Sequence, residues 1–284
     1  MQKDKQLVEA LVTLLSDDDE SVAQTAQNKL IELGADVIPD LEEHLDDQPL
    51  KVKIRAREVM NQLESKTLEE EFRSLPTHYD GDIDLEEALF TLAKIEYPSL
   101  HPKPFRQEIN KISERVEEAL GRWDVRDART TVETVNKVLF EKLGFEGNSE
   151  NYYNSDNSFI NRVIQRRTGI PITLSALMLL VAERQDLPFK GVGMPAHFIV
   201  SYPGEKERIF IDPFNGGKTL TKNDCANFLA KTGFGFVEEY LQPVSNKEII
   251  ERCLRNLINV YHKRERENQV QAVRSYLAII ERQY

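Results

Sequence analysis

The sequence predicts a predominantly helical α+β protein with one small antiparallel sheet. Apolar residues recur three and four positions apart over most of the chain, which is the spacing of one face of a helix. Strand-like runs are confined to residues 197–202 and 208–212 in the second half of the chain. Two such short runs joined by five residues predict a β-hairpin set among helices.

The charge balance argues against several partners. The 284 residues include 37 Lys+Arg and 48 Asp+Glu, a net charge of −11. Nucleic-acid binding and attraction to anionic membrane surfaces both need an excess of cations, so neither partner is expected. No stretch approaches 18 uncharged apolar residues, and charges interrupt the first 20 residues too often for a signal peptide. Two cysteines make no disulfide framework, so a cytoplasmic location is expected.

Residues 1–64 repeat themselves at an offset of 30 positions. Each unit predicts two amphipathic helices with an acidic turn between them, and the pattern resembles HEAT repeats. Both a structural cap and a partner-binding surface fit such a pair of units. Residues 1–50 hold 13 acidic residues against three lysines, so they carry a net −10. The matched positions are Val8 with Ile38, Leu11 with Leu41, Leu15 with Leu45, Val22 with Val52, Ala26 with Ala56 and Leu30 with Met60.

Four segments are expected along the chain. The helical repeats of residues 1–64 precede a linker with a short helix at 65–81, where Pro76 and Gly81 favour turns. Residues 82–245 form the central domain with a helical lead-in. Residues 246–284 predict a helical hairpin.

The candidate chemistry lies in the central domain. A helix is predicted to begin at Pro171, with Thr173 and Ser175 in its first turns. The five-residue loop 203–207 places His197 and Asp212 at the same end of the hairpin, within hydrogen-bonding reach. A helix start, a histidine strand and an aspartate strand form the layout of a papain-like triad of nucleophile, base and orienting carboxylate. The helix start, residues 171–175, has no cysteine.

These residues lie within strings that resemble the SirB1-like, or transglutaminase-like/TPR, branch of the transglutaminase-like superfamily. The resemblance runs from about Ile83 to Leu220 and includes YYNSDNSFINRVIQRRTGIPITLS, MPAHFIV and IDPFNGG. It implies a papain-like core, flanked here by HEAT-like and TPR-like hairpins. It places the superfamily's histidine and aspartate at His197 and Asp212, and its cysteine near 171–175. The branch name is linked to bacterial regulatory roles, and similar domains accompany F-box segments in eukaryotes.

The missing cysteine favours a non-catalytic binding or regulatory module over an enzyme. The alternative is a hydrolase or acyltransferase that uses Thr173 or Ser175 with His197 and Asp212; a third reading is a purely structural adaptor. Protein partners are expected on the helical arms, and a small-molecule or peptide ligand is expected beside His197 and Asp212. The predicted ligand-contacting residues are Tyr152, Tyr153, Asn157 and Asn215.

Other motifs carry no chemistry. The run Gly217-Lys218-Thr219 lacks the glycine that a phosphate loop needs five residues earlier, because Asp212 stands there. Cys225 is predicted near a helix start without an activating neighbour, and Cys253 is predicted in a core. The five histidines have no zinc-ligand spacing, so neither metal nor cofactor is expected.

Overall fold

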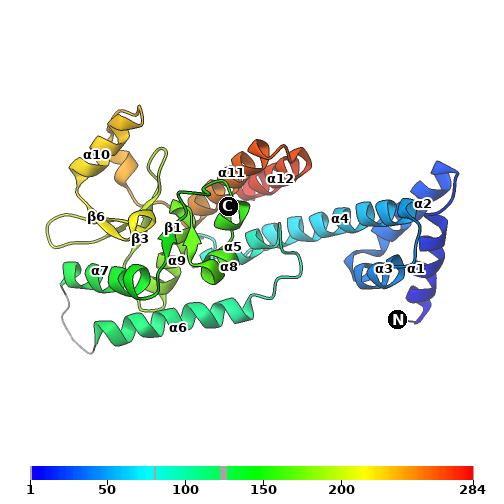
Figure 1. Ribbon diagram of the computed structural model, residues 1–284, viewed down its shortest axis with the longest axis horizontal. Coiled ribbons are helices and arrows are strands. Elements are labelled where there is room, and N and C mark those ends of the chain that lie inside the picture. The colour runs from blue at the N-terminus through cyan, green and yellow to red at the C-terminus, as the bar shows by residue number, and fades with distance from the viewer. Residues whose placement is uncertain (1, 80, 122–126, 284) are drawn as a thin grey trace. The chain divides into compact units, whose positions relative to one another are not determined.

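The computed structural model describes residues 2–79, 81–121 and 127–283 (Figure 1). The chain forms two compact units, Met1–Glu71 and Phe72–Tyr284. Within the described ranges, every helix is too short or too polar to cross a bilayer.

The first unit is a set of four helices whose apolar faces share one core. The turn after α1 leads into α2 at Glu20, whose N-cap is Asp19. Leu15, Leu30 and Leu41 are completely buried in that core, together with Val52. The 30-residue repeat therefore corresponds to two consecutive helix pairs. Their bounds are α1 Gln2–Leu14, α2 Glu20–Leu33, η1 Ala35–Val37, α3 Ile38–Leu45 and α4 Leu50–Arg73.

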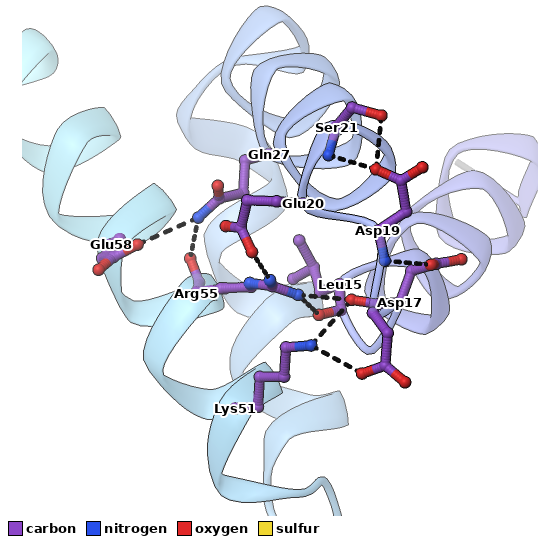
Figure 2. A network of polar contacts seen from close by, with 10 residues as sticks. Leu15, Asp17, Asp19, Glu20, Ser21, Gln27, Lys51, Arg55 and Glu58 are labelled. Carbon is purple, nitrogen blue, oxygen red and sulfur yellow. Dashed lines mark hydrogen bonds and ion pairs between the residues drawn. The ribbon is translucent and has the colours of Figure 1, made fainter.

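One arginine joins the two helix pairs (Figure 2). Arg55 of α4 donates hydrogen bonds to the carbonyl oxygens of Leu15, at 2.7 Å, and Asp17, at 3.0 Å, and forms an ion pair with Glu20. Carbonyls just after a helix lack intrahelical partners, so the guanidinium satisfies groups that burial would otherwise leave unpaired. At the offset of 30 the matching residue is Thr25, so the joint is specific to the second pair.

The first half of the predicted linker at 65–81 is helical. α4 continues without interruption to Arg73. Neither glycine nor proline occurs between Leu50 and Pro76, and Leu68 and Phe72, four residues apart, are both buried. The helix of this segment is therefore the end of α4, and the turn residue Pro76 follows it.

The second unit opens with helices that begin at aspartate caps. Asp84 Oδ1 accepts a hydrogen bond from the Glu87 backbone N–H at 2.8 Å. Asp127 caps α7 in the same way through Thr130. The last turns of that helix are π-helical, which the sequence did not indicate. The bounds are α5 Leu85–Ala93, α6 Lys103–Leu120, α7 Ala128–Asn136, η2 Lys137–Lys142, η3 Ser155–Ser158, α8 Ile160–Arg166 and α9 Pro171–Glu183.

The predicted hairpin is the centre of a four-stranded antiparallel sheet of order β3-β4-β5-β6. Tyr202 pairs with Ile209, one residue from the predicted register. Strands β3 and β6 and the two-residue parallel pair β1–β2 were missed, because runs of two or three residues carry no readable period. The bounds are β1 Glu146–Gly147, β2 Thr168–Gly169, β3 Lys190–Val192, β4 Ile199–Tyr202, β5 Ile209–Asp212 and β6 Lys218–Leu220.

Helix α9 lies at the centre of this unit, against α6, α8, β3 and β4 (Figure 1). It is buried on all sides from Pro171 to Ala182, so its sequence is apolar without a polar stripe. The two C-terminal helices pack as the predicted hairpin. The remaining bounds are η4 Pro213–Asn215, α10 Lys222–Lys231, η5 Glu238–Leu241, α11 Asn246–Lys263 and α12 Glu267–Gln283.

Candidate functional site

The histidine and aspartate of the predicted site are in direct contact. His197 lies two residues before β4, and Asp212 is the last residue of β5. His197 Nε2 is 2.8 Å from Asp212 Oδ2, and the two residues are 8% and 5% exposed. The antiparallel pairing of β4 with β5 brings them together from 15 residues apart. With Nε2 committed to the carboxylate, the other ring nitrogen, Nδ1, has no hydrogen-bond partner among the described residues.

Asn215 also binds the carboxylate of Asp212. Its side-chain Nδ2 donates to Asp212 Oδ2 at 2.7 Å, and its backbone N–H donates to Oδ1 at 3.2 Å. Burial by itself raises the pKa of Asp212, but the hydrogen bonds and charge of His197 and the bonds from Asn215 outweigh it and lower the pKa. Asp212 is therefore held ionised, with Asn215 orienting it.

At the start of α9, the Thr173 hydroxyl is hydrogen-bonded to backbone groups. Thr173 Oγ1 donates to the carbonyl oxygen of Asn157 at 2.7 Å and accepts from the backbone N–H of Ile170 at 3.1 Å. Thr173 is completely buried. Its hydroxyl acts as a helix cap.

Ser175, two residues further along α9, has a side-chain hydroxyl without such hydrogen bonds. Its Oγ is completely buried and forms no hydrogen bond within the described part of the chain. A buried hydroxyl without a partner is uncommon, because it forfeits the hydrogen bonds that it makes in water. Ser175 is thus the free hydroxyl near the position where the resemblance places the nucleophile.

Both thiols are unsuited to nucleophilic chemistry. Burial, followed by the charges of Asp224 and Asp212, raises the pKa of Cys225 to about 11. Burial also raises the pKa of Cys253 to about 12. Since the thiolate is the reactive form, neither side chain is activated at neutral pH.

Aromatic side chains surround the histidine. The His197 ring centroid is 5.1 Å from that of Phe228 on α10 and 6.5 Å from that of Phe214. The Phe214 ring is in turn 6.0 Å from the Tyr152 ring. Neither phenylalanine was among the predicted site residues, although Phe214 stands inside the motif IDPFNGG.

The loop that carries Tyr152 and Tyr153, here called the tyrosine loop, is exposed, whereas the nearby Asn157 is buried. Tyr152 and Tyr153 are 37% and 47% exposed and pack edge to face at 5.3 Å. Asn157 is completely buried, and its Nδ2 donates to the carbonyl oxygens of Asn151 and Tyr152. Asn157 thus holds the loop through backbone carbonyls, and its contact with a ligand stays a prediction.

A surface cavity of about 620 Å³ lies away from this pair of residues. It is bounded by α7, the start of β5 and η5, with Val132, Phe210 and Leu241 among its lining residues. Neither His197 nor Asp212 lines it. Within the described ranges, no three His, Cys, Asp or Glu side chains gather as metal ligands.

Comparison with known proteins assigns the family. The profile of the "Transglutaminase-like superfamily" matches residues 103–255, more than half of the chain. The chain belongs to the transglutaminase-like superfamily. Its motifs and relatives place it in the SirB1-like branch. No solved structure matches it.

Two kinds of relatives stand out. A "UPF0162 protein" of Xylella fastidiosa (strain 9a5c) is 33% identical over 200 residues, which cover 67% of this chain and 69% of that protein. A "UPF0162 protein" of Vibrio cholerae is 31% identical over 193 residues. "F-box only protein 21" of Mus musculus is 32% identical over 155 residues, 51% of this chain but 24% of the mouse protein. The transglutaminase-like segment thus occurs both in chains of similar size and as part of a longer protein.

Proposed function

We propose that this transglutaminase-like protein is a binding module without nucleophilic catalysis. The observation that carries the proposal is the start of α9, where residues 171–175 offer no thiol and the Thr173 hydroxyl caps its own helix. A weak nucleophile needs a base within hydrogen-bonding reach. No hydrogen bond of the described residues joins Thr173 to His197, and neither thiol is activated.

One observation favours the hydrolase or acyltransferase alternative. Ser175 Oγ lacks a hydrogen-bond partner, and His197 Nδ1 is the ring nitrogen that the bond from Nε2 to Asp212 leaves available as a base. Complete burial of Ser175 argues against it, because an acyl substrate must reach the hydroxyl. The two candidate functions differ in one chemical event, acylation of Ser175.

Covalent probes separate the two candidates. Treatment of the folded chain with a fluorophosphonate should leave Thr173 and Ser175 unmodified, as mapped by mass spectrometry, because neither hydroxyl is activated. The His197→Ala variant should give the same map. Stoichiometric labelling of Ser175 that disappears in His197→Ala would establish the enzyme and reject the binding module.

The first helix pair supports a protein-binding role. Its outer side, formed by α1 and α2, contains a cavity of about 550 Å³ lined by Leu14, Val22 and Ala26 among others. Leu14 is 42% exposed. At the offset of 30, Val22 and Ala26 match Val52 and Ala56, which are completely buried. Val22 is half-buried where its match Val52 is completely buried, as expected at the unstacked end of a repeat array, whereas Ala26 is buried like Ala56.

The partner that fits this outer side is a basic, amphipathic helix pair. A helix pair would continue the stacking already present between the two repeats. The net −10 over residues 1–50 disfavours a second copy of the same acidic lobe and favours a partner that carries Lys and Arg around its apolar face.

Substitution of one exposed leucine tests this surface. Leu14→Glu should reduce cross-linking to the bound partner by about tenfold, because a charge would be buried in the apolar contact. Leu50→Glu is the matched control, since Leu50 is 73% exposed on α4 and does not line the cavity. Recovery of the same cross-linked proteins with Leu14→Glu as with the native chain, at equal thermal stability, would reject the surface.

A further inference from the structure

Arg252 of α11 ties down the turn that carries His197. Its Nη2 donates to the carbonyl oxygens of Met194, at 3.0 Å, and His197, at 3.2 Å. Between them, Ala196 adopts a left-handed backbone with φ of 61°, unusual for a residue other than glycine. The guanidinium therefore contacts the backbone of the histidine, although the two residues are 55 positions apart in the chain.

This guanidinium has no carboxylate partner among the described residues. Other arginines of the same unit do: Arg184 pairs with Glu86, and Arg266 with Glu96 at 2.8 Å. Arg252 is half-buried, and burial lowers its pKa. A partly desolvated cation is usually compensated by an anion, since two carbonyl oxygens supply only partial charge. Its Nε and Nη1 groups also donate no hydrogen bond to the described residues.

Aromatic side chains lie between the neighbourhood of Arg252 and the candidate site. Tyr152 lies near Arg252, because burial raises the pKa of Tyr152 and the charge of Arg252 opposes that rise. From Tyr152 the aromatic rings continue through Phe214, at 6.0 Å, to His197, a further 6.5 Å away. Tyr152 remains 37% exposed, so this aromatic surface begins in solvent and ends at the histidine.

A second cation of the same helix flanks the tyrosine loop. Lys263 Nζ lies 3.4 Å from the centroid of the Tyr153 ring. Eleven residues separate Lys263 from Arg252 on α11, a rise of roughly 16 Å at 1.5 Å per residue. The loop is thus bordered by positive charge on α11, in a chain whose net charge is negative.

We propose that Arg252 binds an oxyanion, either a carboxylate or a phosphate, on a ligand that lies against Tyr152 beside the His197–Asp212 pair. The planar guanidinium fork matches two oxygens of either group, which a point charge such as lysine does not. This inference rests on the proposed binding role of the His197 site and specifies the chemistry of its ligand. The same interaction would neutralise the charge behind the histidine.

Titration of the full chain tests the proposal. Inorganic phosphate and acetate are added in separate arms at constant ionic strength, and the arginine Nε–H signals are followed by NMR. One or both anions should shift the Arg252 signal with saturation, and Arg252→Gln should weaken binding by about tenfold or more. The arm that saturates at lower concentration identifies the source of the oxyanion.

Two further variants make the result decisive. Arg255→Gln is the control, because Arg255 lies on the same helix but pairs with Glu251 and Glu281; its affinity should equal that of the native chain. Arg252→Lys keeps the positive charge without the planar guanidinium and should bind the anion more weakly than the native chain. If Arg252→Gln unfolds, the affinity of Arg252→Lys tests the proposal in its place. Failure of both anions to saturate the native chain, or equal affinity in Arg252→Lys, overturns the proposal. A negative anion titration leaves the proposal of a non-catalytic binding module standing. Fluorophosphonate labelling of Ser175 would reject the non-catalytic module but would leave the result of the anion titration unchanged.

Discussion

Asp212→Ala is expected to lower the free energy of unfolding by about 3 kcal/mol, because it leaves buried hydrogen-bond donors without an acceptor. The donors are His197 Nε2 and the side-chain and backbone N–H groups of Asn215. Their partner is 5% exposed, so water replaces the carboxylate poorly. Urea unfolding of the native chain and the variant at neutral pH measures the difference.

Asp224→Ala is the matched control for that change. Asp224 belongs to the same unit but is exposed, and it accepts hydrogen bonds from Thr221 at the start of α10. Its loss should be clearly smaller, because solvent compensates the Thr221 groups. Equal losses for the two aspartates would mean that the His197–Asp212 pair contributes nothing beyond an ordinary cap.

The pH dependence of the Asp212 contribution has a defined sign. The pKa of Asp212 is lower in the folded state than in an unfolded chain, for which it is about 4. Its stabilisation is therefore fully present above the unfolded pKa and is lost as the pH falls through the folded pKa. The stability difference between the native chain and Asp212→Asn should shrink on acidification below about pH 4. A difference that grows on acidification would contradict the lowered pKa.

Gly217→Ala is expected to cost about 3 kcal/mol, the second large effect. Gly217 has a φ of 75°, and an added Cβ would lie 2.5 Å from the Phe140 ring and 2.7 Å from Asn136 Cγ. Asn136 Nδ2 also donates to the Gly217 carbonyl at 2.6 Å, so displacement of Asn136 would lose that bond. Backbone strain and overpacking therefore act together.

The neighbouring glycine isolates the packing contribution. Gly216 has a φ of 67°, but a Cβ there would meet no atom within 4 Å. Gly216→Ala should therefore cost only the backbone strain, about 1 kcal/mol. Thermal unfolding of both variants gives the comparison, and equal melting temperatures would show that Phe140 and Asn136 move aside without cost.

Much of the second unit was predictable because its signals are local. The Asp84 cap and the two C-terminal helices follow from side chains within a few residues of one another. The hairpin placed His197 opposite Asp212 because a five-residue loop leaves few registers. The hydrogen bond between them follows from that register. The sequence placed a short helix within 65–81, and the structure joins that helix to α4, which runs to Arg73.

The sequence by itself determined the family, the helical class, the paired histidine and aspartate and the lack of a cysteine at residues 171–175. These depend on residue identity and on spacing along a strand or a helix. Only the tertiary structure decided which hydroxyl is committed, with Thr173 bonded to Asn157 and Ser175 left without a partner. It also placed Arg252 behind His197 and Phe228 against its ring. Those contacts join segments more than 15 residues apart, so no local period encodes them, and they arise only when α9, α10 and α11 pack around one sheet.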